Sequence, residues 1–187
     1  MSFLTVKSLR PIRFLNLPHL LLCTRHASTR TRPRRALLFV PGSNPRMLEK
    51  GMNLDNVDAL ILDLEDSVAT HQKVGARSSI VDALNVEWWR SSSFERDRET
   101  DSGVQQQGGG RSEKFVRINA VATGLAADDL KTVLRSPYLE GIVIPKVDSA
   151  FEVQEVERMV QEFSLPGANV RLLASIESPL AIMNLKE

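Results

Sequence analysis

Short apolar runs rich in β-branched residues alternate with longer amphipathic runs from residue 35 onward, and this alternation constrains the fold more than any other feature. It is typical of βα units, in which helices cover a parallel sheet. Each apolar run is nearly continuous, as expected of a strand that is buried on both faces. The predicted strands are residues 36–40, 59–64, 114–119, 141–147 and 170–176. The predicted helices are residues 45–53, 73–87, 126–135, 149–163 and 179 onward.

Two of these helices carry recognisable start signals. Ser149 and Glu152 have the spacing of a capping box, in which side chain and backbone of the two residues bond reciprocally. Asn44 precedes Pro45, which is the order of an N-cap residue followed by proline at the first helical position. Residues 41–43 before them are therefore either a simple turn or part of a site.

Residues 1–34 have a composition unlike the rest of the chain. They are rich in arginine, contain serine and threonine, and lack Asp and Glu, which is typical of a mitochondrial transit peptide. A secretory signal centred on residues 20–22 is the alternative, but Asn16 and Pro18 interrupt its apolar run. No apolar stretch approaches the roughly 20 residues that span a bilayer. We expect a mitochondrial protein that is not inserted in a membrane.

The charge of the remaining chain excludes two classes of function. The whole chain carries a net charge of +1, and eight basic residues lie within residues 1–35, so the part after Arg35 carries −7. An acidic domain of this kind lacks the basic face that nucleic acid requires. The single cysteine, Cys23, lies in the leader, which excludes cysteine chemistry in the folded domain.

One segment interrupts the predicted domain, which extends over residues 35–187. Residues 91–112 are rich in charged residues, Ser, Gln and Gly. Such a composition cannot bury enough apolar surface to offset the entropy of ordering. We predict a disordered insertion there.

Polar residues follow the predicted strands at the end where ligands bind in parallel α/β folds. Because side chains alternate along a strand, Arg117 and Asn119 should share one face, and Arg117 should point into the site. The same alternation places the carboxylate of Glu177 at this end. The residues at the strand ends are Asp63, Glu65 and Asp66, then Arg117 and Asn119, then Lys146, and finally Glu177 and Ser178.

A carboxylate beside a guanidinium suggests a hard cation and an anionic substrate. Glu177 suits Mg²⁺, which one or two protein carboxylates commonly hold, and Arg117 offers a planar fork that matches a carboxylate. Other interpretations stay open: Glu177 as an acid at a helix N-terminus, or Arg117 as a structural partner of Glu65 or Asp66. The acidic residues after the second strand could also order their loop by bonding to backbone amides or to Lys73 and Arg77.

Five sequence motifs, each on a successive predicted strand, resemble the HpcH/HpaI aldolase and citrate lyase β-subunit family, and most closely its mitochondrial citrate lyase β-like branch. The resemblance covers residues 35–187. The motifs are RALLFVPGSNPRM at 35–47, DALILDLEDSVA at 58–69 with Lys73 and Ala76–Arg77, FVRIN at 115–119, GIVIPKV at 141–147, and IESPLA at 176–181.

The resemblance implies an α/β fold, a TIM (β/α)8 barrel of which this chain covers about the first five βα units. It implies a Mg²⁺ cofactor held by Glu177, with Arg117 binding the substrate carboxylate. Both residues are implied to be catalytic and substrate-binding, while Glu65 and Asp66 are secondary substrate-binding residues. Ser178 stands where the family usually has threonine, and the second metal carboxylate of the family would lie beyond residue 187.

The implied activity is that of a Mg²⁺-dependent carbon–carbon lyase acting on a CoA thioester of a hydroxy-dicarboxylate or tricarboxylate, of citryl-CoA or malyl-CoA type. Alternatives are a thioesterase that forms malate, or a truncated binding protein without catalysis. The expected partners are the CoA thioester and an oxo-acid, and a full-length protein is expected to be a homo-oligomer, specifically a trimer. Five strands do not close a barrel of eight, so residues 35–187 alone are expected to be inactive.

Overall fold

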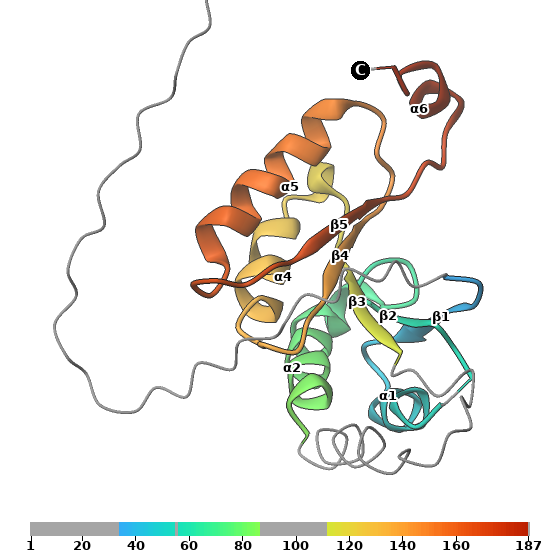
Figure 1. Ribbon diagram of the computed structural model, residues 1–187, viewed down its shortest axis with the longest axis vertical. Helices are drawn as coiled ribbons and strands as arrows, with labels where there is room; N and C mark the ends of the chain where they lie inside the picture. Colours follow the sequence, from blue (N-terminus) through green and yellow to red (C-terminus); the bar gives the residue numbers. More distant parts are fainter. Residues whose placement is uncertain (1–33, 55, 87–111, 187) are drawn as a thin grey trace, which may run out of the picture. The chain divides into compact units, whose positions relative to one another are not determined.

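Five parallel strands form one sheet whose spatial order is the order of the chain, β1-β2-β3-β4-β5. The computed structural model, shown in Figure 1, describes residues 34–54, 56–86 and 112–186. All five predicted strands are confirmed, although most are shorter than predicted because the chain leaves the sheet early. Their bounds are β1 Leu37–Pro41, β2 Ala59–Asp63, β3 Glu113–Arg117, β4 Gly141–Ile144 and β5 Arg171–Ala174.

The predicted helices are also confirmed, each following its strand. Asn44 caps the first, since the Met47 amide donates to its side-chain oxygen over 3.2 Å. The capping box of Ser149 and Glu152 starts the fourth. Two short 3₁₀ helices, Thr70–Gln72 and Val121–Thr123, were not predicted. The α-helices are α1 Pro45–Met52, α2 Lys73–Asn85, α4 Ala126–Val133, α5 Ala150–Phe163 and α6 Pro179–Met183.

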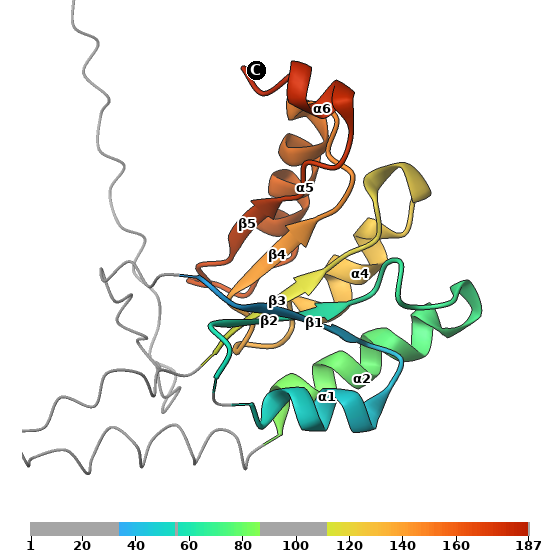
Figure 2. The same ribbon diagram turned by 90° about the vertical axis from the view of Figure 1, so that its right-hand side faces the viewer.

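The main hydrophobic core lies between the sheet and the first four of these helices. Alternate residues of the strands point toward the helices. Successive helices pack against one another in chain order along the sheet (Figure 2). Burial of these aliphatic side chains is the main stabilising contribution to the domain. The core includes Leu60, Leu62, Val116, Ile142 and Ile144 of the sheet, and Leu48, Ile80, Leu130, Val156 and Met159 of the helices.

The opposite face of the sheet is covered less completely. Ala59, Ile61, Phe115 and Val143 form a small buried cluster at its centre. The edge strands differ, because Phe39 and Leu173 of β1 and β5, like several of their neighbours, are exposed. The prediction that every strand is buried on both faces is therefore wrong for β1 and β5. Among the described residues each has only one neighbouring strand, and the closed eight-stranded barrel stays a prediction.

The predicted leader and insertion lie outside the described residues, except for one residue of each. Arg34 forms an ion pair with Glu113, and the side chain of Ser112 is buried and donates to the carbonyl of Val57 over 2.8 Å. The leader and the disordered insertion stay predictions. Helices long and apolar enough to cross a bilayer do not occur in the part of the chain that the structure describes.

Candidate active site at the carboxyl ends of the strands

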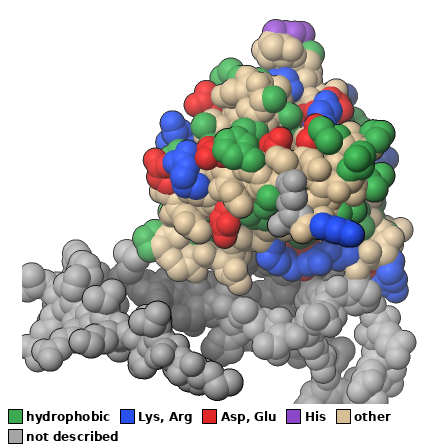
Figure 3. Space-filling model, turned by 90° about the horizontal axis from the view of Figure 1, so that it is seen from above, with side chains coloured by type: hydrophobic (Ala, Val, Ile, Leu, Met, Phe, Trp, Pro, Cys, Tyr) green, Lys and Arg blue, Asp and Glu red, His purple; other side chains and the backbone are tan. Residues whose placement is uncertain are grey.

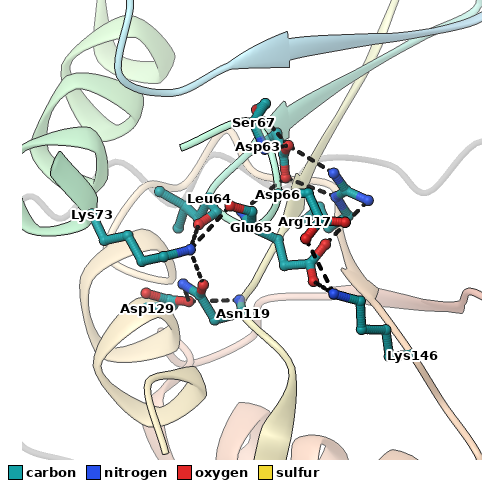
Figure 4. Close-up of polar contacts among 10 residues, drawn as sticks. All are labelled: Asp63, Leu64, Glu65, Asp66, Ser67, Lys73, Arg117, Asn119, Asp129 and Lys146. Atoms are coloured by element: carbon teal, nitrogen blue, oxygen red, sulfur yellow. Dashed lines mark hydrogen bonds and ion pairs between the residues drawn. The ribbon is translucent and has the colours of Figure 1, made fainter. Parts of the chain in front are cut away.

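Arg117 forms a two-pronged ion pair with Asp63 at the carboxyl end of the sheet. The two residues are direct neighbours in the register of β2 and β3, so their side chains leave the same face side by side. The Arg117 Nε and Nη2 atoms lie 2.7 Å from the two carboxylate oxygens of Asp63 (Figure 4). This fork-to-fork geometry is the strongest form of the arginine–carboxylate interaction.

Asp63 also organises the turn that follows β2. Its carboxylate accepts hydrogen bonds from the backbone amides of Glu65, over 2.9 Å, and Ser67, over 3.1 Å. Burial opposes ionisation of this carboxyl more strongly than any single contact favours it. The hydrogen bonds from Arg117, from the Ser67 hydroxyl and from the Glu65 amide nevertheless combine to lower the pKa of Asp63 below its usual value. Asp63 is therefore a buried, ionised anchor for both the turn and Arg117.

Glu65 lies between two cations. Its side chain is only 6% exposed, with one oxygen 3.3 Å from Arg117 Nη1 and the other 2.6 Å from Lys146 Nζ. Lys146 also reaches Asp66, over 3.1 Å. These hydrogen bonds, led by the one to Glu65, raise the pKa of Lys146, and the same lysine lowers the pKa of Asp66. Three acidic side chains and two cations thus form one cluster.

Lys146 adopts a left-handed backbone conformation, with φ of 52°. A residue other than glycine rarely adopts it, because its Cβ approaches the backbone. The sequence places Lys146 at the end of β4, but nothing in its spacing indicates that it reaches across β3 to the turn after β2. Its place in the cluster was therefore missed. The signal available in the sequence was the complementary charge of two adjacent acids, Glu65 and Asp66, and of a lysine at the end of another predicted strand.

The prediction for Arg117 is confirmed in one respect and corrected in another. Arg117 lies at the expected end of the sheet, and its guanidinium stacks 4.9 Å from the centre of the Phe39 ring. The hydrogen bonds that Arg117 donates to the Asp63 carboxylate raise the pKa of Arg117. Of the two structural partners considered from the sequence, Glu65 contacts Arg117 directly, whereas the principal partner is Asp63.

Asn119 does not share the face of Arg117, so that prediction is wrong. The strand ends at Arg117, and strict alternation of side chains ends with it. The Asn119 side chain instead contacts Lys73 and Asp129, which belong to α2 and α4 (Figure 4). Asn119 is buried and belongs to the layer between sheet and helices.

Glu177 lies three residues beyond β5 and is exposed. Its carboxylate makes no hydrogen bond or ion pair with any described residue. Ser178, the next residue, caps α6 by accepting the Ala181 amide over 3.0 Å, so Glu177 is not needed as a cap. The neighbouring hydrophobic side chains of Ile176 and Leu180 are also exposed. Figure 3, which shows the molecule from above the view of Figure 1, has hydrophobic groups scattered among charged ones.

Glu177 is available to a metal ion, but the structure brings no ready-made ligand set to it. Within the described ranges, no three His, Cys, Asp or Glu side chains are grouped to hold a metal. Mg²⁺ commonly takes one or two protein carboxylates and completes its octahedron with water and substrate. A single uncommitted carboxylate matches that donor chemistry.

Together these features define an α/β protein whose helices cover one face of a parallel sheet and whose charged residues gather at the carboxyl ends of the strands. This is the end at which α/β folds carry their ligand sites. The chain belongs to the HpcH/HpaI aldolase/citrate lyase family, whose sequence model matches residues 35–92 and 102–187. The predicted family is therefore confirmed.

Two relatives and one solved structure illustrate the similarity. The chain is 35% identical over 159 residues to mitochondrial citramalyl-CoA lyase of Homo sapiens, covering 82% of this chain and 40% of that protein. It is 31% identical to citrate lyase subunit beta of Leuconostoc mesenteroides subsp. cremoris, covering 83% of this chain and 46% of that protein.

The solved structure is that of protein CitE from Mycobacterium tuberculosis in complex with magnesium and acetoacetate. It matches with a TM-score of 0.50 and 27% identity, over 80% of this chain and 46% of that one. The chain thus spans less than half the length of each protein compared with it.

Proposed function

We propose that the protein containing this chain is a Mg²⁺-dependent carbon–carbon lyase for the CoA thioester of a small hydroxy-dicarboxylate or tricarboxylate. The supporting observation is the Arg117 cluster at the carboxyl end of the sheet, in a chain whose relatives include a citramalyl-CoA lyase and a citrate lyase subunit. Cleavage removes the proton of the substrate hydroxyl and leaves the electron pair of the broken carbon–carbon bond on the α-carbon of the thioester. That carbon then takes up a proton, which yields an acyl-CoA and an oxo-acid.

Arg117 is proposed to bind a carboxylate of the substrate. Asp63 occupies the Nε and Nη2 side of the guanidinium, which fixes its plane. The side formed by Nη1 and Nη2 can then receive a carboxylate, and Glu65 is the chain's own occupant of Nη1. Glu65 is also bound to Lys146, so it keeps one cationic partner when a substrate carboxylate replaces it at Arg117 Nη1.

Glu177 is proposed to hold Mg²⁺, whose role when bound is to stabilise negative charge that develops on the oxygen of the oxo-acid. The structural relative crystallised with magnesium and acetoacetate supports this choice of metal. Glu65 and Asp66 are proposed as secondary substrate-binding residues. A mitochondrial location is proposed from the basic leader and from the mitochondrial citramalyl-CoA lyase among the relatives.

The test is a coupled assay of the complete protein with citramalyl-CoA, citryl-CoA and malyl-CoA. We expect oxo-acid release with at least one ester, abolished by EDTA and restored by Mg²⁺. Arg117→Lys should lower kcat/KM by about 10²-fold or more, because lysine cannot reproduce the planar fork. The matched control is Arg135→Lys on an exposed arginine, which should leave kcat/KM unchanged. Absence of EDTA-sensitive turnover on all three esters would rule out the proposal.

A further inference from the structure

Lys73, at the start of α2, reaches the ends of two strands at once. Its ammonium group donates to the carbonyl oxygens of Leu64, over 2.9 Å, and Glu65, over 3.0 Å. It also donates to the side-chain oxygen of Asn119, which follows β3. A lysine ammonium has three N–H donors, and here each has an acceptor.

Asn119 is itself held in place from the helices. Its backbone and side-chain nitrogens both donate to one carboxylate oxygen of Asp129, over 2.8 and 2.7 Å. The other oxygen of Asp129 accepts from Arg77 Nε over 2.7 Å, and the Asp129 side chain is fully buried. A continuous network therefore runs from Arg77 of α2, through α4 and the end of β3, to Lys73 and the turn after β2. Figure 4 shows the part of it from Asp129 to the turn.

This network binds the backbone of the turn that carries the acidic residues of the candidate site. Beyond Asp63 the chain leaves the sheet, so the carbonyls of Leu64 and Glu65 need donors from outside the strand ladder. Lys73 donates to both from one side of the turn, and the Val68 amide, within the turn, also donates to the Glu65 carbonyl over 3.2 Å. On the other side, the Glu65 carboxylate contacts Arg117 and Lys146. The backbone contacts set where that carboxylate can lie.

We propose that Lys73 is a positioning residue, which holds the turn of residues 64–67 so that Glu65 meets Arg117 and Lys146. The expected loss of activity rests on the proposed function, whereas the claim that Lys73 holds the turn does not. The network also explains why a lysine and an arginine stand four residues apart at the start of α2. Arg77 fixes Asp129, Asp129 fixes Asn119, and Asn119 directs Lys73 onto the turn.

The experiment compares three variants of the complete protein with the wild type. Lys73→Met removes the donors but retains the chain length, Lys73→Arg restores charge and donors, and Lys50→Met is the control on an exposed lysine of α1. Hydrogen exchange of the backbone amides is the first readout. In Lys73→Met, amides of residues 64–68 should exchange at least about 10-fold faster while those of β2 keep their protection. In Lys73→Arg the exchange rates of these amides should lie between those of Lys73→Met and the wild type. In Lys50→Met they should equal those of the wild type.

The second readout is turnover of the CoA ester identified in the assay above. Loss of a residue that orients the groups touching substrate typically costs about 10–100-fold in activity, and we expect that loss in kcat/KM of Lys73→Met with partial recovery in Lys73→Arg. Unchanged exchange, or equal acceleration throughout β2 and α2, would overturn the proposal. So would faster exchange with wild-type kcat and KM. If the wild type turns over none of the esters, the proposed function fails, while the exchange pattern still decides whether Lys73 holds the turn.

Discussion

The pairing of Arg117 with Asp63 predicts a large and pH-dependent loss of stability when the arginine is removed. In Arg117→Met, a carboxylate that is 1% exposed loses its two-pronged partner. Removal of one member of a buried ion pair costs about 3–5 kcal/mol. Asp63 keeps its bonds from the amides of Glu65 and Ser67, and the Arg117 side chain is 15% exposed, so we expect about 2–3 kcal/mol.

The sign of the pH dependence follows from the lowered pKa of Asp63. A carboxyl whose pKa is lower in the folded state contributes stability above its unfolded value, 3.8, and loses it as the pH falls through the folded value. In Arg117→Met the opposing effect of burial becomes dominant and raises that pKa. The variant should therefore be least stable relative to the wild type at neutral pH, and the difference should shrink in acid as Asp63 takes up a proton in both proteins.

Urea titration of the complete protein, from neutral pH into the acid range, measures this difference. The control is a double-mutant cycle with Asp63→Asn, which retains the shape of the side chain but removes the charge. We expect a coupling energy between Asp63 and Arg117 of about 2 kcal/mol. A coupling below about 0.5 kcal/mol, or a difference that does not change with pH, would show that the pair behaves as a surface contact and would refute the reasoning.

Three further predictions concern other parts of the fold and site. Gly141→Ala should cost about 1–3 kcal/mol in urea unfolding, since its Cβ would lie 2.4 Å from the Phe115 ring; wild-type stability would contradict this. Glu177→Gln should abolish Mg²⁺-dependent activity, because it removes the proposed carboxylate ligand. The melting temperature should not change, since the exposed carboxylate has no partner among the described residues, and Mg²⁺-dependent turnover in the variant would contradict the prediction. In Lys146→Met, NMR titration should show the pKa of Asp66 rising toward 3.8, and an unmoved pKa would exclude the contact.

The sequence was sufficient for most of the fold because its signals are local. Asn44 before Pro45, and Ser149 three residues before Glu152, mark helix starts through contacts within one turn. Apolar runs marked the strands for the same reason. Strand ends were overestimated where apolar residues such as Val147 continue beyond the sheet, since an apolar side chain can pack against a helix as well as in a strand.

The candidate site was only partly predictable. The expectation that polar residues gather at the carboxyl ends of the strands identified Arg117, Glu65 and Asp66, since topology alone brings those ends together. Their partners were not determined in this way. Arg117 pairs with Asp63 because the register of β2 and β3 makes them neighbours, and register depends on the packing of the whole sheet.

The sequence by itself therefore determined the order of strands and helices, the family, and the end of the sheet at which the polar residues lie. Only the tertiary structure decided which charges meet: Lys146 reaching Glu65 from two strands away, and Lys73 binding the backbone of the acidic turn. The physical reason is the range of the interactions. Helix caps and apolar periodicity act between residues a few positions apart, whereas these ion pairs and hydrogen bonds join residues whose proximity exists only once the sheet has formed.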